Sequence, residues 1–174
     1  MPTTKRPDSN ECAAYHSGYI SLVPDGDIVD FLTIQGKKIP NFIRSIPPEK
    51  ADIIHQPYSW TVRQVLEHCM DAERVFGYRV LRFSTGDRTD LPGWNENDYA
   101  ASGYGPNAGL NELAEEFSAL RGAIVCQTKR LSAEAWERSG TADGRGVSVR
   151  TLIWLMAGHW LHHQAILLKR LILD

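Results

Sequence analysis

The sequence predicts an all-α protein, a four-helix bundle with a long crossover between its second and third helices. Three observations support this fold class. Apolar residues recur at helical spacing in four long stretches, strand-like alternation is scarce, and residues 85–107 form an unusually long connection. A crossover of that length allows the second and third helices to run in the same direction, with the fourth opposed to the second.

Length and composition indicate one domain of 174 residues, with 43% hydrophobic residues and a net charge of −2. Residues 1–24 lack a period and predict an irregular arm, which leaves residues 25–174 for the bundle. The absence of a basic run argues against binding to nucleic acid or anionic membranes. No apolar signal-peptide segment is present, and the three cysteines are scattered without a Cys-x-x-Cys pair, which favours a reducing, cytoplasmic setting.

The first helix is predicted between residues 28 and 46, after Asp25-Gly-Asp27 and before Pro47-Pro48. The second is predicted from Thr61 to about Ser84. Thr61 and Gln64 have the spacing of a capping box, in which each side chain bonds the backbone N–H of the other residue.

The long connection is expected to contain a short helix over residues 95–101. The third helix is predicted from Leu110 to Leu131, with one extra turn over residues 132–136 and a loop over residues 139–146. Ser148 then has the position of an N-cap for the last helix.

The last helix is apolar almost all round, which predicts that it is the central helix of the core. It nevertheless carries His159, His162 and His163. Residues four apart lie one above the other on a helix, about 6 Å apart along the axis. His159 and His163 are therefore spaced so that two imidazoles can bind one metal ion.

A third histidine is expected opposite this pair. His68 lies roughly 10 Å from the start of the second helix, and His163 lies roughly 12 Å before the end of the fourth. In an antiparallel pair these positions are at the same level. Three neutral imidazoles leave coordination positions open, as in catalytic metal sites.

The alternative is that each of these histidines is an ordinary core or boundary residue. His162 points about a quarter-turn away from His163, so it is expected to be exposed or to support the site, and it is the fallback ligand. Asp71 could orient an imidazole and is the candidate catalytic residue. Trp94, Tyr99 and Tyr104 in the long connection either line a substrate pocket or pin the loop to the core.

Other metal and nucleotide motifs are missing. A zincin His-Glu-x-x-His motif would need Glu where Trp160 stands, and no Glu-x-x-His occurs for a di-iron site. No phosphate-binding glycine loop or Gly-x-Ser-x-Gly elbow is present.

Three segments together resemble the DinB superfamily, which includes the DinB/YfiT-like metalloenzymes. They are Tyr58-Ser-Trp60-Thr-Val-Arg-Gln-Val-Leu-Glu-His68-Cys-Met-Asp71-Ala-Glu73-Arg, Leu91-Pro-Gly-Trp94-Asn-Glu-Asn-Asp98-Tyr99 and Ala157-Gly-His159-Trp-Leu-His162-His163-Gln164. The resemblance covers roughly residues 28–172 and leaves out the arm.

This resemblance implies an up-down-down-up bundle, often a homodimer, that holds a divalent metal such as zinc or nickel on His68, His159 and His163. Relatives of this kind include thiol S-transferases and a maleylpyruvate isomerase that use low-molecular-weight thiols such as bacillithiol or mycothiol.

Three functions follow as hypotheses. The leading one is a metal-dependent, thiol-dependent S-transferase acting on a small-molecule substrate. The second is a metal-dependent hydrolase that activates water. The third is a non-enzymatic, stress-associated dimeric bundle in which metal is structural or absent.

Overall fold

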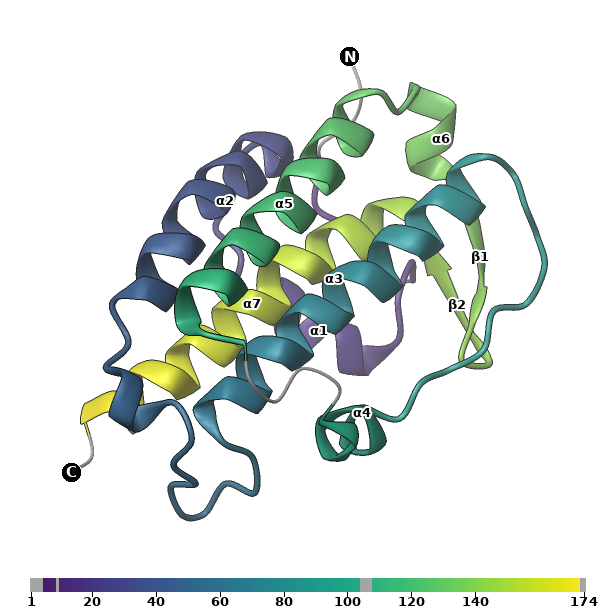
Figure 1. Cartoon of the computed structure of the whole chain (residues 1–174). Helices are drawn as coiled ribbons and strands as arrows, with labels where there is room; N and C mark the ends of the chain where they lie inside the picture. Colours follow the sequence, from purple (N-terminus) through teal and green to yellow (C-terminus); the bar gives the residue numbers. More distant parts are fainter. Residues whose placement is uncertain (1–4, 9, 104–107, 173–174) are drawn as a thin grey trace.

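The computed structural model describes residues 5–8, 10–103 and 108–172. Four long helices form a bundle: α2 (Ile28–Arg44), α3 (Val62–Ser84), α5 (Leu110–Lys129) and α7 (Val149–Ile172) (Figure 1). Helix α2 packs mainly on α5, and α3 packs mainly on α7. The prediction of a helical bundle is confirmed, and the two helices that carry the histidines are neighbours.

The predicted helix starts are confirmed at the two helices that matter for the site. The Thr61 hydroxyl accepts a hydrogen bond from Gln64 N (3.1 Å), and Thr61 N donates to Gln64 Oε1 (2.8 Å), which completes the capping box of α3. At α7, the Ser148 hydroxyl accepts a hydrogen bond from Thr151 N (3.0 Å). Local sequence therefore sets where both helices begin.

The smaller elements are helices α1 (Ala14–Ile20), α4 (Glu96–Ser102) and α6 (Ala133–Glu137), a short 3-10 helix (Pro48–Lys50), and a hairpin of β1 (Ser139–Ala142) and β2 (Arg145–Ser148). Helix α4 and helix α6 match the predicted short helices.

The prediction of a loop over residues 139–146 was wrong. These residues form most of the hairpin, whose two-residue turn is Asp143 (φ 56°) and Gly144 (φ 68°). The arm is also not wholly irregular, since it contains α1.

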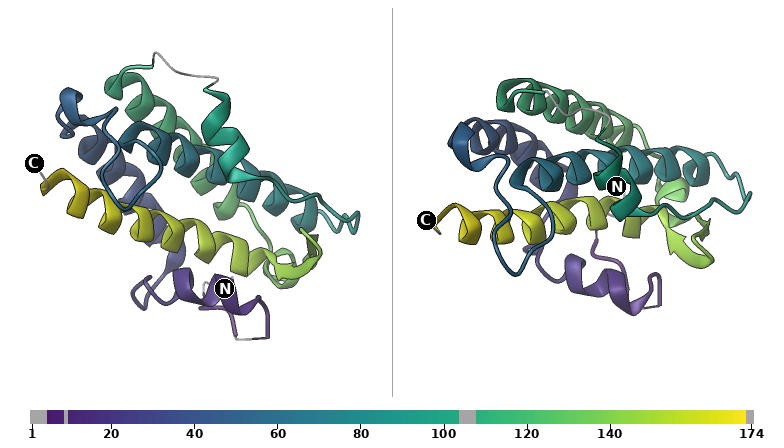
Figure 2. Two further views of the ribbon diagram at one scale, coloured as in Figure 1. Left: turned by 90° about the horizontal axis from the view of Figure 1, so that it is seen from below. Right: turned by 60° about the horizontal axis from the view of Figure 1, so that its bottom comes forward.

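Helix α7 lies between α1 on one side and the other long helices on the other, and both views in Figure 2 show this arrangement. Every residue from 149 to 160 is buried, as its apolar circumference predicted. In the part of the chain that the structure describes, no helix is long and apolar enough to cross a membrane.

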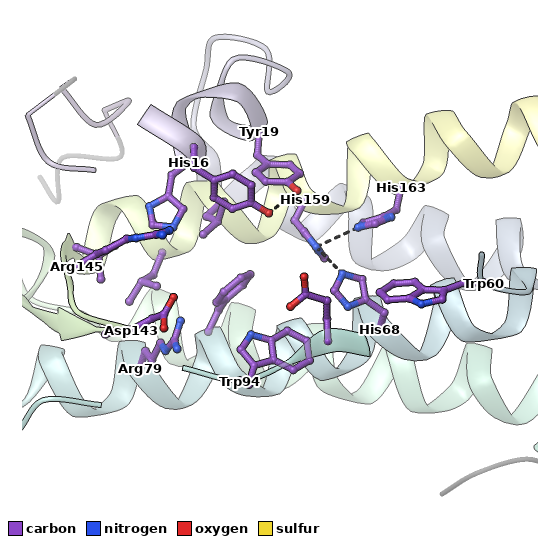
Figure 3. Close-up of a pocket in the computed structure, with 17 residues that line it drawn as sticks. His16, Tyr19, Trp60, His68, Arg79, Trp94, Asp143, Arg145, His159 and His163 are labelled. Carbon is purple, nitrogen blue, oxygen red and sulfur yellow. Dashed lines mark hydrogen bonds between the residues drawn. The ribbon is translucent and has the colours of Figure 1, made fainter. Parts of the chain in front are cut away.

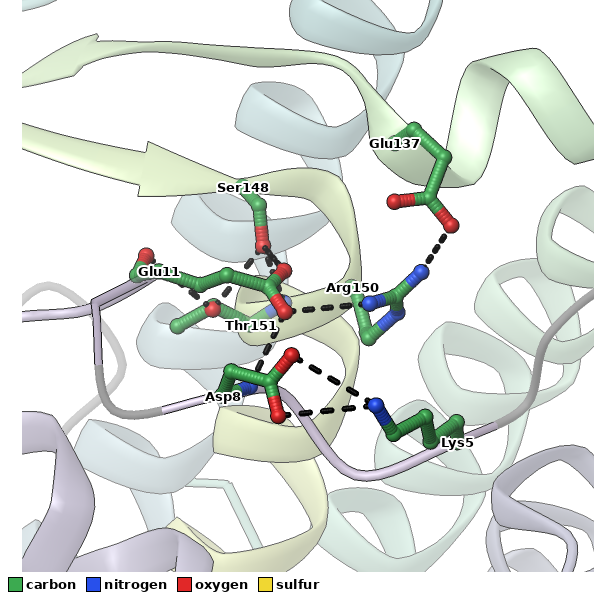
Figure 4. A network of polar contacts seen from close by, with 7 residues as sticks. All are labelled: Lys5, Asp8, Glu11, Glu137, Ser148, Arg150 and Thr151. Atoms are coloured by element: carbon green, nitrogen blue, oxygen red, sulfur yellow. Dashed lines mark hydrogen bonds and ion pairs between the residues drawn. The ribbon is translucent and has the colours of Figure 1, made fainter.

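The arm that carries α1 is tied to the start of α7 by polar contacts (Figure 4). The Glu11 carboxylate accepts hydrogen bonds from the Ser148 hydroxyl (2.8 Å) and from Arg150 Nη1 (3.0 Å). Arg6 donates to the carbonyl oxygens of Ile20 and Val23, each at 2.6 Å. These contacts hold α1 in place although the arm has no regular period.

A series of buried hydrogen bonds, called the polar chain below, connects all four long helices. Arg121 of α5 is fully buried and pairs with both oxygens of Glu73 of α3, at 2.6 and 2.8 Å. Its third contact is Gln35 Oε1 of α2 (2.6 Å), and Gln35 Nε2 donates to the carbonyl oxygen of Ala157 of α7 (3.1 Å). Because an unpaired charge at this depth is strongly destabilising, the four helices must keep one mutual register.

Gly158 allows α1 to approach α7 closely, beside His159. A Cβ at this position would stand 2.1 Å from the carbonyl oxygen of Tyr19. We predict that Gly158→Ala displaces α1 and lowers the free energy of unfolding by about 1–3 kcal/mol, because this contact is between backbone atoms that have little freedom to yield. Urea unfolding and amide hydrogen exchange across residues 14–20 measure both effects.

The matched control is Gly122→Ala in α5, where an added Cβ meets nothing within 4 Å. That substitution is expected to leave α1 protected and to raise stability by up to about 1 kcal/mol through helix propensity. Equal stability and equal α1 protection in the two variants would contradict the proposed close contact.

Candidate metal centre

Three histidines from two helices converge on one point, and they are the three candidate metal ligands identified from the sequence (Figure 3). His68 comes from the second turn of α3, while His159 and His163 come from successive turns of α7. His68 Nε2 lies 3.0 Å from His159 Nε2, and His163 Nε2 lies 3.1 Å from the same atom. All three nitrogens lie within 4.8 Å of one another.

This geometry fits a metal ion. Two imidazole nitrogens bound to one tetrahedral zinc are about 3.3 Å apart, since each Zn–N bond is about 2.0–2.1 Å. Hydrogen bonding alone explains the arrangement less well, because neutral imidazole has a single N–H and His159 Nε2 faces two other ring nitrogens. A cation at their centre would satisfy all three lone pairs.

The electrostatics also favour neutral, ligand-ready imidazoles. The pKa of His68 is lowered to about 4 and that of His163 to about 3, mainly by burial, with a smaller contribution from neighbouring histidines. Burial likewise holds the pKa of His159 well below its usual value. Metal ions bind the neutral form of histidine, so no proton has to be removed near pH 7.

Aromatic rings pack against two of the three histidines, His68 and His159. The Trp94 ring stacks on His68 with an angle of 11° and a centroid distance of 5.5 Å, and Trp60 contacts the same imidazole at 5.0 Å. Tyr19 and Phe76 contact His159 at 5.5 and 6.0 Å. Trp94 therefore lies against the site. This agrees with the alternative in which the aromatic residues of the long connection line a pocket.

The other candidates lie outside this cluster. His162 packs against Tyr19 and His163, at 5.1 and 5.0 Å between ring centroids, and its imidazole is not among the three that converge. Asp71 pairs with Arg74 (3.4 Å) and, together with Tyr99, lines a separate hollow. Tyr99 reaches the site only indirectly, edge-on against Trp94 at 5.1 Å. Tyr104 lies outside the described residues.

The histidines form one end of an elongated cavity of about 470 Å³. Tyr15, His16 and Tyr19 of α1 form part of its wall. Glu96 of α4 also lines it, and its negative charge offsets part of the lowering of the His68 pKa. The far end is lined by Arg79, Asp143 and Arg145.

The lining residues from α1, α4 and the hairpin were not predicted from the sequence, because they are far from the histidines along the chain. One local signal was available. Asp143-Gly144 is a common dipeptide in two-residue hairpin turns, and it could have indicated that residues 139–148 return as a hairpin. No local signal places His16 in the same cavity.

Comparisons with known proteins agree with this architecture. A family model described as the DinB superfamily matches residues 32–167. No curated protein sequence matches the chain.

Among solved structures, the chain is similar to YfiT from Bacillus subtilis, described as a probable metal-dependent hydrolase with an unusual four-helix bundle topology. The TM-score is 0.72 and the identity 15%, over 95% of this chain and 91% of that chain. It is also similar to the mycothiol-dependent maleylpyruvate isomerase and to a histidine-to-alanine mutant of that enzyme. Each gives a TM-score of 0.65 and 15% identity, over 83% of this chain but only 61% of that chain.

Identities this low show a shared fold and do not by themselves transfer an activity. The family match is broader evidence, because it spans most of the bundle and includes both helices that carry the three histidines. The chain therefore belongs to the DinB superfamily.

Proposed function

We propose that this protein is a divalent-metal-dependent enzyme in which His68, His159 and His163 are the metal ligands. The observation that carries the proposal is that three imidazole Nε2 atoms, from histidines with lowered pKa values, converge at one end of a cavity of about 470 Å³. Three protein ligands leave room for a substrate atom at the metal, which is the usual composition of a catalytic site. Zinc and nickel are the metals that we propose.

When bound, the metal would lower the pKa of a thiol or water that joins it. The protein supplies the remaining conditions. Trp60, Phe76 and Trp94 place apolar surface against His68 and His159, which strengthens electrostatic interactions there. The cavity volume falls within the range of small-molecule sites.

Our preferred reaction is the transfer of a low-molecular-weight thiol to a small electrophile. The thiolate sulfur forms the new bond to carbon, and the leaving group departs with its electron pair. The aromatic lining suits a soft sulfur nucleophile, and a solved structure with the same fold is described as a mycothiol-dependent isomerase. In this reaction a lowered thiol pKa already supplies the thiolate nucleophile at neutral pH, so no dedicated general base is required.

Metal-dependent hydrolysis is the second candidate, and one observation favours it. Glu96 lines the cavity, and its charge acts on His68, so it can serve as a general base for an attacking water. Asp71, the candidate catalytic residue from the sequence, lines a different hollow.

We also propose the up-down-down-up helix order and a homodimer, as the family resemblance implies.

The metal site can be tested by elemental analysis of protein without a histidine tag, loaded with zinc or nickel. We predict about one metal ion per chain in the wild type. His163→Ala should lose it because a three-ligand site then retains only two ligands. His162→Ala is the matched control and should keep the metal. Equal metal content in both variants, or none in the wild type, would favour the non-enzymatic bundle.

Activity assays on the metal-loaded protein then separate the two reactions. Conjugation of a model electrophile that requires added thiol, and that survives Glu96→Gln, supports the transferase. Turnover of esters or amides without thiol, with a large loss of kcat in Glu96→Gln, supports the hydrolase instead.

The lowered histidine pKa values also predict how the metal-free protein responds to acid. Below pH 6.5 the unfolded chain binds protons at these histidines, while the folded chain does not until about pH 4. The free energy of unfolding should therefore fall from pH 7 to pH 5, by up to roughly 1.4 kcal/mol per pH unit for each such histidine. Urea titrations of chelated wild type and His163→Gln measure this slope. Identical slopes for the two proteins would argue against the buried, neutral state of His163.

A further inference from the structure

The end of the cavity away from the histidines has the composition of an anion site. It brings together Arg79 of α3, Arg145 of β2, His16 of α1 and Asp143 of the hairpin turn (Figure 3). Two guanidinium groups and one carboxylate leave a net charge of about +1 at this end, with His16 neutral. No residue of this group belongs to the proposed metal site.

Arg79 is the buried member of the group. Arg79 is only 8% exposed, and its Nη2 atom donates a hydrogen bond to the carbonyl oxygen of Pro92 (3.0 Å). Among the described residues it forms no ion pair, although the charge of Asp143 acts on it, and burial lowers its pKa. A guanidinium has five N–H donors, so most of the hydrogen-bonding capacity of Arg79 is not used by the single bond to Pro92.

His16 lies beside Arg145, across the cavity from Arg79 (Figure 3). Its Nδ1 atom is buried and has no hydrogen-bond partner among the described residues. Burial lowers the pKa of His16, and the charges of Arg145 and Arg79 lower it further. The electrostatic field at this end of the cavity therefore disfavours additional positive charge and favours an anion.

The group is held by rigid local structure. Asp143 N donates to the carbonyl oxygen of Leu91, and Leu91 N donates to that of Thr141, each at 3.0 Å. The side chain of Asp143 packs against Gly93, where an added Cβ would stand 2.2 Å from Oδ1. The hairpin turn is thus fixed to the segment between α3 and α4, and Asp143 and Arg145 are presented to the cavity together.

We propose that this end of the cavity binds the carboxylate of a small molecule whose reactive group lies at the three histidines. Arg79 and Arg145 supply the donors, because the planar guanidinium fork matches a carboxylate in a bidentate pair. A net charge of about +1 suits a monoanionic carboxylate better than a dianionic phosphate. The assignment deepens the proposed function, and it rests on that function for the position of the reactive group.

The first experimental arm tests the anion site independently of the metal. Straight-chain alkanoic acids of increasing length, the matching primary amides and the matching alkyl phosphonates are titrated by calorimetry into the protein, as purified and after chelation. The expected result is that acids bind at least about tenfold more tightly than amides and more tightly than phosphonates. Arg145→Gln should remove this preference for acids and leave amide binding unchanged.

Arg145 is suitable for substitution because its side chain is exposed, so the variant should fold. Arg130→Gln, which removes the same charge from an exposed position on the loop after α5, is the matched control and should keep the preference. Arg79→Lys tests the fork, since it keeps the charge but should weaken acid binding. Equal binding of acid and amide, tighter binding of the phosphonate, or equal losses in Arg145→Gln and Arg130→Gln would each overturn the proposal.

The second arm links the two ends of the cavity. ω-Mercaptoalkanoic acids and their amides are added to the cobalt-substituted protein, and the change in its visible absorption reports thiol binding at the metal. Acids of one favoured chain length should bind more tightly than shorter and longer ones, and Arg145→Gln should abolish that optimum. If no thiol changes the spectrum while the first arm still shows the acid preference, the thiol chemistry fails and the carboxylate site stands.

Discussion

The buried ion pair between Glu73 and Arg121 is the constraint on which the rest of the structure depends. Both side chains are almost completely buried, and the charges are balanced only while α3 and α5 hold their positions. Gln35 extends the pair to α2, and its amide reaches the carbonyl oxygen of Ala157, two residues before His159. Since Glu73 is five residues after His68 on α3, one polar chain sets the relative register of both helices that carry the histidines.

That arrangement divides the molecule into two kinds of structure with different roles. The histidines are on long packed helices, which hold ligand atoms more accurately than loops. The remaining walls come from α1, α4 and the hairpin, which are short elements that determine what the cavity can accept. The candidate metal ligands and the remaining cavity walls therefore come from separate parts of the chain.

Much of this was predictable from the sequence, and the limits have physical causes. Helical spacing and the caps at Thr61 and Ser148 are local signals, so the long helices and their starts were predicted correctly. The three histidines could be grouped because two share one helix face and the third lies at the matching level of a neighbouring helix. The cavity wall could not be derived in the same way. Its position depends on long-range contacts, such as Glu11 with Arg150 and Leu91 with the hairpin, which leave no periodic pattern. Asp71 was predicted near the site from its spacing to His68, yet it faces a different hollow.

The central claim is that three imidazoles, and no other side chains, bind one metal ion. X-ray absorption spectroscopy of the zinc-loaded or nickel-loaded protein at the metal edge tests it most directly. The account predicts a first shell with three imidazole nitrogens at about 2.0–2.1 Å if the metal is zinc, completed by light atoms that are not from the protein. A first shell containing protein sulfur or carboxylate, or one with fewer than three imidazoles, would contradict it.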